Sequence, residues 1–326
     1  MTTQSPTSPG LVDVHAHFIT EDYVAAALAA GHGHPDGMPG WPDWSADAHL
    51  RSMDRWGVER SMLSISSPGI HFGDDAAAGR LGRQVNIEAA RLVRQHPDRF
   101  GHFASLPLPD VDGALGELEY ALDQLGSDGV VVKTNSGGRY LGDEGFSPLL
   151  DELDRRAAIV FVHPTSPPAA DQIALGRPSP MLEFIFDTTR TVSDLLYAGG
   201  FERYPRIKWI FTHSGGALPV LADRLELFRR VIPGDSNARA FAEQLSDLWF
   251  DIAGTPFPRQ VPALVTAFGA ERLLYGSDHC WTPAAAVDAQ LAAIDRADQP
   301  PNDSWRALTR RNTDRLLARA DAPSLR

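Results

Sequence analysis

The sequence contains very little cysteine and very little lysine. Cys280 is the one thiol among 326 residues, so no internal disulfide can form and a cysteine-rich zinc site is excluded. A chain of this kind suits a reducing compartment, where any metal would bind histidine and carboxylate side chains. Lysine occurs twice, as Lys133 and Lys208, whereas arginine is common.

Clusters of positive charge and long apolar runs are also missing. The formal net charge is −12 and there is no basic run, which argues against nucleic acid or a membrane surface as the main partner. Residues 1–10, MTTQSPTSPG, have neither a basic start nor an apolar stretch, so they predict no secretory signal and no transmembrane segment. We therefore expect a cytoplasmic protein with a disordered tail over residues 1–10.

Short apolar runs alternate with longer segments of helical periodicity along the rest of the chain. Such segments include residues 146–157 and 191–205, which we expect to be helices. Eight apolar runs occur: LVDVHAHF, VERSMLSISS, FGHFASLPL, GVVVKTN, AIVFVHP, IKWIFTHSGG, DLWFDIAG and RLLYGSDH. Eight strand and helix units predict one (β/α)8 TIM barrel over residues 11–326. The competing open doubly wound sheet lacks its glycine fingerprint after the first run.

The first apolar run carries two histidines at an unusual spacing. In LVDVHAHFIT, residues 11–20, the period of two indicates a strand that places His15 and His17 on one face together with Asp13. The same spacing recurs at His32 and His34, but their setting, GHGHPDGMPG, is rich in glycine and proline and indicates a loop. We therefore expect a functional role for the first pair alone.

Polar side chains recur where the predicted strands end. A barrel brings the carboxyl ends of its strands together at one mouth, so these side chains should converge. They are His15, His17, Lys133, His163, His213 and Asp278. Nitrogen and carboxylate ligands of this kind suit a divalent ion such as zinc, manganese or iron, with one position open for water or substrate.

Each of these residues also has a structural interpretation. A single strand-end histidine is more often hydrogen-bonded than metal-bound, and HSGG, residues 213–216, could be a simple turn. Asp278 could cap a helix, and Lys133 could pair with a nearby acid. Cys280 is expected to be an inert thiol. Lys133 and Cys280 are thus expected to be structural, and the functional interpretation depends on the strand-end histidines and Asp278 meeting at one place.

The ordered set of motifs resembles the amidohydrolase superfamily, specifically the branch of aminocarboxymuconate semialdehyde decarboxylase and the related aromatic-acid decarboxylases. The motifs are DVHAHF, HPDRFGHFASLPL, VHP, GGFERYPRIKWIFTHSGG, LLYGSDHCW and NTDRLL, and they span nearly the whole chain. Within the branch, residues 31–69 look most like the 6-methylsalicylate decarboxylases.

The resemblance implies a role for each site residue. His15, His17, His163 and Asp278 would bind one divalent ion, zinc or else manganese, and His213 would be the catalytic histidine beside it. Trp281 would contact a small aromatic acid substrate. Relatives are often dimers or tetramers, so the resemblance also implies a homo-oligomer.

The chain departs from the branch at two places. After GSD the branch commonly continues with an aromatic residue and proline, whereas His279 and Cys280 stand here. Residues 21–50 contain no arginine, and the semialdehyde decarboxylase would need arginine contacts for its two carboxylates. The second departure argues against the same substrate.

Three functions follow as hypotheses. The first is non-oxidative decarboxylation of an ortho-hydroxy aromatic acid such as 6-methylsalicylate, with Asp278 or a water held by His213 as the proton donor. The second is hydrolysis of a lactone, ester or amide on the same metal site, a reaction that a carboxylated Lys133 bridging a second ion would favour. The third is a non-catalytic metal-binding or assembly protein, which the clustered strand-end ligands disfavour.

Overall fold

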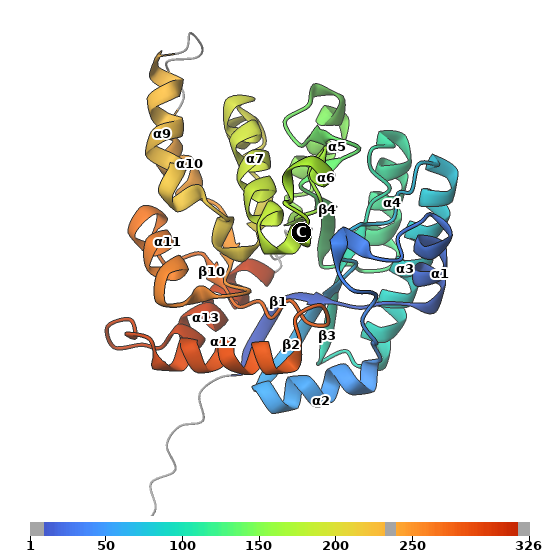
Figure 1. Ribbon diagram of the computed structural model, residues 1–326, viewed down its shortest axis with the longest axis horizontal. Helices are drawn as coiled ribbons and strands as arrows, with labels where there is room; N and C mark the ends of the chain where they lie inside the picture. The colour runs from blue at the N-terminus through green and yellow to red at the C-terminus, as the bar shows by residue number, and fades with distance from the viewer. Residues whose placement is uncertain (1–9, 232–238, 319–326) are drawn as a thin grey trace, which may run out of the picture.

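Eight parallel strands form a nearly closed barrel in the computed structural model, which describes residues 10–231 and 239–318 (Figure 1). The strands follow one another around the barrel in chain order: β1 (Leu11–His17), β2 (Val58–Ser64), β3 (Phe100–Ser105), β4 (Gly129–Lys133), β7 (Ile159–His163), β8 (Lys208–Phe211), β9 (Trp249–Asp251) and β10 (Leu273–Leu274). Two bridges, Asp13 to Tyr275 and Ala16 to His279, join the last strand region to the first. The predicted (β/α)8 barrel is confirmed, and each strand lies within one of the eight predicted runs.

Helices surround the barrel (Figure 1). They are α1 (Glu21–Ala29), α2 (Ala46–Trp56), α3 (Asp75–Gln95), α4 (Val111–Asp123), α5 (Ser147–Arg155), α6 (Ala170–Ile173), α7 (Glu183–Tyr197), α8 (Gly200–Arg203), α9 (Leu218–Val231), α10 (Phe241–Ser246), α11 (Val261–Phe268), α12 (Ala284–Arg296) and α13 (Trp305–Leu317). The helix expected over 146–157 is α5. The one expected over 191–205 is divided between α7 and α8, because Gly199 adopts a left-handed conformation with φ 69°. The tail predicted for residues 1–10 lies outside the described residues except for Gly10.

Local side-chain signals explain where several helices begin and end. The carboxylate of Asp110 accepts a hydrogen bond from the Gly113 N–H at 3.0 Å and so caps α4. Ser45 caps α2 in the same way, and Gly57, with φ 69°, ends that helix directly before β2. The connection at Gly57 is therefore short and keeps α2 next to β2. Among the described residues, no helix is long and apolar enough to cross a membrane.

The barrel interior is a small apolar cluster separate from the larger core between strands and helices. Each barrel strand contributes a side chain to it: Val14, Met62, Phe103, Val131, Phe161, Ile210, Trp249 and Leu274. Phe103 and Phe161 stack there with ring centroids 5.5 Å apart. Because this cluster fills the middle of the barrel, the polar side chains at the carboxyl ends of the strands gather above it and not inside it.

Candidate active site

Four of the predicted residues meet above the apolar cluster. His15 and His17 lie on β1, His163 is the last residue of β7, and Asp278 follows β10. One ligand atom from each of these side chains lies within 4.8 Å of the ligand atoms of the other three. The three histidines are buried, and Asp278 is partly exposed. The structure therefore brings together the four residues expected to bind one metal ion.

The three histidines are oriented by hydrogen bonds from their Nδ1 atoms. Each Nδ1 faces a carboxylate or carbonyl oxygen and so donates a proton to it, which leaves Nε2 as the ring atom that can bind a metal ion. The contacts are His15 to Asp251 Oδ2 at 2.9 Å, His17 to the Ser64 carbonyl at 3.2 Å, and His163 to the Pro164 carbonyl at 2.7 Å. The Nε2 atoms of His15 and His17 are buried and face Asp278 Oδ1 at 3.4 and 3.2 Å, with no other polar partner within the described structure. Such nitrogen atoms fit a divalent metal ion, which would satisfy them.

The charges in the cluster also suit a cation. Burial lowers the pKa of His17 to about 4 and holds that of His163 well below its usual value, so both rings are neutral. Burial lowers the pKa of His15 as well, but the charges of Asp251 and Asp278 outweigh it and raise that pKa to about 10. Two carboxylates in a buried cluster therefore hold a proton where a metal ion would compete with it.

Asp278 owes its place to the unusual backbone of the loop that carries it. Its φ is 58°, and its N–H donates to the His15 carbonyl at 2.8 Å. Burial would raise the pKa of Asp278, but the charge of His15 and contacts with His15, His17 and His213 keep it well below its usual value. The alternative role as a helix cap is wrong, because α12 begins six residues later at Ala284.

Asp13 supports this loop and does not join the ligand cluster. Its Oδ1 accepts hydrogen bonds from the N–H groups of His15 and Ser277, both at 3.0 Å. Because Asp13 links the strand that carries two histidines to the loop that carries Asp278, it helps to fix the distance between them.

His213 lies at the edge of the cluster. Its Nε2 is 3.6 Å from Asp278 Oδ2, and its backbone has a φ of 51°. Its N–H donates to Asp251 Oδ1 at 3.0 Å, while Asp251 Oδ2 accepts from His15. One buried carboxylate therefore positions both the ligand His15 and the neighbouring His213. The sequence interpretation missed Asp251, which lies within the seventh apolar run and is the last residue of β9.

A cavity of about 440 Å³ opens beside the cluster and is lined by His163, His213 and Asp278. Its other walls are largely apolar and include Met38, Met181, Phe184, Ile185 and Trp281. Trp281 packs against Trp41 with ring centroids 5.5 Å apart, which places its indole at the cavity wall. None of the described residues that line this cavity is lysine or arginine, and Asp36 is a further acid in it.

Lys133 is close to the cluster without belonging to it. Its backbone is paired with that of His163, but its Nζ donates to the Ile65 carbonyl at 2.7 Å. Burial lowers the pKa of Lys133 to about 7. The thiol of Cys280 is also buried, and burial raises its pKa to about 12, in agreement with the inert thiol predicted from the sequence.

Comparison with known proteins places this geometry in a family. The Amidohydrolase family model matches residues 12–319. The chain is 34% identical to decarboxylase yanB of Aspergillus niger over 96% of this chain and 89% of that protein. It is 35% identical to the 6-methylsalicylic acid decarboxylase acuB of Aspergillus aculeatus over 85% of this chain and 86% of that protein.

Solved structures give the same result. The crystal structure of an amidohydrolase II matches this chain with a TM-score of 0.87 and 35% sequence identity. The match covers 95% of this chain and 100% of that chain. A dihydroxybenzoic acid decarboxylase from Polaromonas, solved with manganese and the inhibitor 2-nitroresorcinol, is 22% identical. Its TM-score is 0.81 over 96% of this chain and 98% of that one, which shows a shared fold. The chain therefore belongs to the amidohydrolase family, in the branch that contains the aromatic-acid decarboxylases.

Proposed function

We propose that this protein is a metal-dependent, non-oxidative decarboxylase of an ortho-hydroxy aromatic acid, with 6-methylsalicylate as its favoured substrate. The observation that carries the proposal is a buried cluster of three histidines and one aspartate beside an apolar cavity with no cationic side chain among its described lining residues. The relatives that resemble the chain over most of its length include 6-methylsalicylic acid decarboxylases.

His15, His17, His163 and Asp278 would hold one divalent ion, and the buried Nε2 atoms of His15 and His17, which face the Asp278 carboxylate, support that assignment. We propose zinc, with manganese as the alternative, because both accept histidine and carboxylate ligands. The bound ion would supply the positive charge that anchors a carboxylate and an adjacent phenol oxygen. The remaining chemistry belongs to the residues around it.

Decarboxylation requires a proton at the ring carbon that bears the carboxylate. When that carbon has been protonated, the bond to the carboxylate breaks, its electron pair returns to the ring, and carbon dioxide leaves. His213, at the edge of the cluster and in the cavity wall, would hold the water or the proton that reaches this carbon. Asp278 is the alternative donor, but the charges around it keep its carboxylate ionised, which favours the role of a ligand.

The cavity supports a substrate with one acidic group. Trp281 offers a flat apolar wall for an aromatic ring. Asp36, held by a hydrogen bond from the Ser166 hydroxyl at 2.6 Å, places a negative charge in the cavity. A second carboxylate on the substrate would meet this charge with no cationic side chain in the described lining to offset it, so a monocarboxylate fits better.

We further propose that the protein acts in the cytoplasm as a homo-oligomer, either a dimer or a tetramer. The single buried thiol supports a reducing compartment. Exposed apolar side chains on neighbouring helices, including Tyr197 on α7 and Val220 and Leu227 on α9, support contacts between subunits. Analytical ultracentrifugation measures the oligomeric state directly.

The proposed reaction is tested by incubating the metal-loaded protein with 6-methylsalicylate in deuterated water. We expect 3-methylphenol with deuterium where the carboxylate was. The acid 3-hydroxybenzoate, which cannot present adjacent carboxylate and hydroxyl groups, should be inert. Similar turnover of both acids would refute the chelation argument. Inactivity on every salicylate together with hydrolysis of a lactone would replace decarboxylation by the hydrolase hypothesis.

A further inference from the structure

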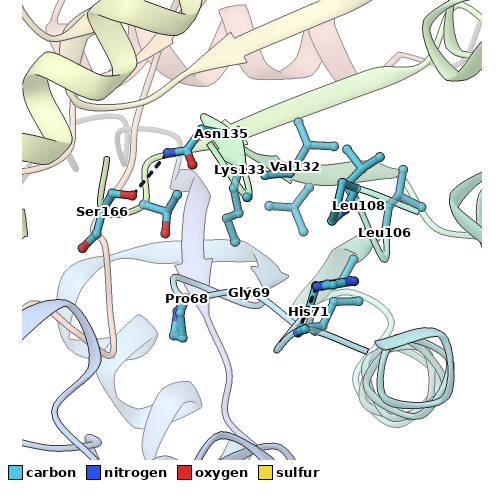
Figure 2. Close-up of a pocket in the computed structure, with 17 residues that line it drawn as sticks. Pro68, Gly69, His71, Leu106, Leu108, Val132, Lys133, Asn135 and Ser166 are labelled. Carbon is cyan, nitrogen blue, oxygen red and sulfur yellow. Dashed lines mark hydrogen bonds between the residues drawn. The ribbon is translucent and has the colours of Figure 1, made fainter. Parts of the chain in front are cut away.

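A second cavity, of about 400 Å³, lies over the carboxyl ends of β2, β3 and β4 (Figure 2). It shares no lining residue with the metal cavity. The two are separated where the loops after β2 and β7 meet, at a hydrogen bond of 2.8 Å between the hydroxyls of Ser67 and Thr165. Gly73 and Gly137, both exposed, lie at the rim of the second cavity, so a solute can enter without passing the metal site.

Lys133 is the only lysine or arginine among the described residues that line this second cavity, and no aspartate or glutamate lines it. Its side chain runs from β4 toward the loop of Pro68 and Gly69 (Figure 2). The absence of a side chain at Gly69 leaves room for it, because a Cβ there would approach Lys133 Cε to 3.2 Å. The glycine at position 69 therefore lets the Lys133 side chain extend across the cavity.

The amine of Lys133 has unused hydrogen-bonding capacity. An ammonium group has three donors, and the Ile65 carbonyl accepts one of them at 2.7 Å. Asp36 is the acid that acts on Lys133 electrostatically, but within the described structure no carboxylate forms an ion pair with the amine. Because burial of this amine without a carboxylate partner disfavours its charged form, an anion bound to the amine would restore that charge, so the site favours an anion.

The rest of the lining shows what kind of anion fits. Ile70, Leu106, Leu108, Val131 and Val132 form a continuous apolar wall, with Leu106 and Leu108 on the far side of the cavity from Ser166 (Figure 2). Asn135 does not compete for the amine, because its acceptor Oδ1 already accepts from the Gly138 N–H at 3.2 Å. An inorganic anion would leave the apolar wall uncovered, whereas an organic acid would cover it.

We propose that this cavity is a second binding site, for a small organic monocarboxylate, with the carboxylate on Lys133 Nζ and the apolar body against Leu106 and Leu108. The site is distinct from the metal cavity, and the proposal does not depend on the proposed decarboxylase activity. Bicarbonate shares the carboxylate chemistry and serves as the comparison ligand.

The probe is 4-fluorobenzoate, which lacks the ortho hydroxyl and is observed by ¹⁹F NMR with the metal-loaded protein. Lys133→Met should weaken its binding at least tenfold. The matched control is Lys208→Met, because Lys208 is the only other lysine and its Nζ donates to the Leu316 carbonyl, away from this cavity. Equal binding by the wild type and both variants would overturn the proposal.

A second measurement needs no variant. Acetylation of the wild-type amines is followed by peptide mass spectrometry, with the two lysines read separately. We expect 4-fluorobenzoate to slow the acetylation of Lys133 at least fivefold and to leave that of Lys208 unchanged. Protection of Lys133 by bicarbonate but not by 4-fluorobenzoate would overturn the assignment to an organic acid, and no protection by either would overturn the site.

Discussion

Replacing Asp251 by asparagine tests how the metal site is oriented. The two carboxylate oxygens have different partners, because Oδ1 accepts from the N–H groups of His213 and Ala253, each at 3.0 Å, and Oδ2 accepts from His15 Nδ1 at 2.9 Å. An asparagine must place its NH₂ group toward one side. Facing the backbone would cost two hydrogen bonds, each worth about 1 kcal/mol or more, so we expect the NH₂ group to face His15.

In that arrangement His15 must move its proton to Nε2, the atom that faces the other ligands. We expect Asp251→Asn to lower metal affinity 10- to 100-fold, the range typical of losing such an orienting contact, which is about 1.4 to 2.8 kcal/mol. Removing the charge of Asp251 also lowers the affinity of His15 for a proton, which by itself would favour metal binding. The same charge, however, attracts a divalent ion at least as strongly as it attracts a proton, so its removal also lowers the metal affinity. The loss of metal affinity should therefore persist, and it should grow between pH 6.5 and 8.5, because the wild-type proton, held with a pKa of about 10, competes less with the metal as the pH rises.

The assay is competition for the metal against a chromophoric chelator, with thermal unfolding measured on the same samples. Asp128→Asn is the matched control, because Asp128 precedes β4 at the opposite end of the barrel, where its carboxylate accepts from the His102 N–H at 3.1 Å. This control can lose stability but should keep its metal affinity. Wild-type affinity in a folded Asp251→Asn protein would refute the orientation argument.

Four further predictions concern the same region. Elemental analysis should find about one divalent ion per chain in the wild type and little in a His15→Ala, His163→Ala double variant, and unchanged occupancy would dismiss the ligand assignment. His213→Ala should retain the ion and lose most turnover with 6-methylsalicylate, whereas loss of the ion would make His213 a ligand. Because the pKa of His15 is raised to about 10, metal binding to the metal-free protein at pH 7 should release nearly one proton. The apparent metal affinity should therefore rise as the pH increases. Calorimetry in buffers of different ionisation enthalpy counts the released proton. Asp36→Asn keeps an oxygen that can accept from the Ser166 hydroxyl and removes one repulsive charge. We expect it to raise kcat/KM for a salicylate with a second carboxylate, relative to kcat/KM for 6-methylsalicylate, roughly tenfold. An unchanged ratio would show that Asp36 has no role in specificity.

The sequence predicted most of the fold and the ligand cluster because both follow from local patterns. The run that contains His15 and His17 has strand periodicity, and barrel geometry brings strand ends together wherever they lie in the chain. The supporting contacts could not be predicted in this way. Asp251 is 236 residues from His15, and nothing near it in the sequence identifies its partner.

Two other residues show the same limit. Asp36 stands in a proline and glycine turn and reads as an ordinary turn residue, yet its φ of 54° and its contact with Ser166 place it in the metal cavity. Lys133 was recognised as a strand-end residue, but its direction depends on the room left at Gly69. Side-chain direction is decided by packing between distant segments, which periodicity does not contain.

The lining of the metal cavity has a consequence for product release. A phenol keeps the ring and hydroxyl of the substrate but has lost the carboxylate, and none of the described lining residues is a lysine or arginine that could retain it. If the phenol ionises, Asp36 repels it. The reaction would thus remove one of the two oxygen-bearing groups by which the bound ion would anchor the substrate, so the phenol would bind less firmly than the acid and would compete weakly with it.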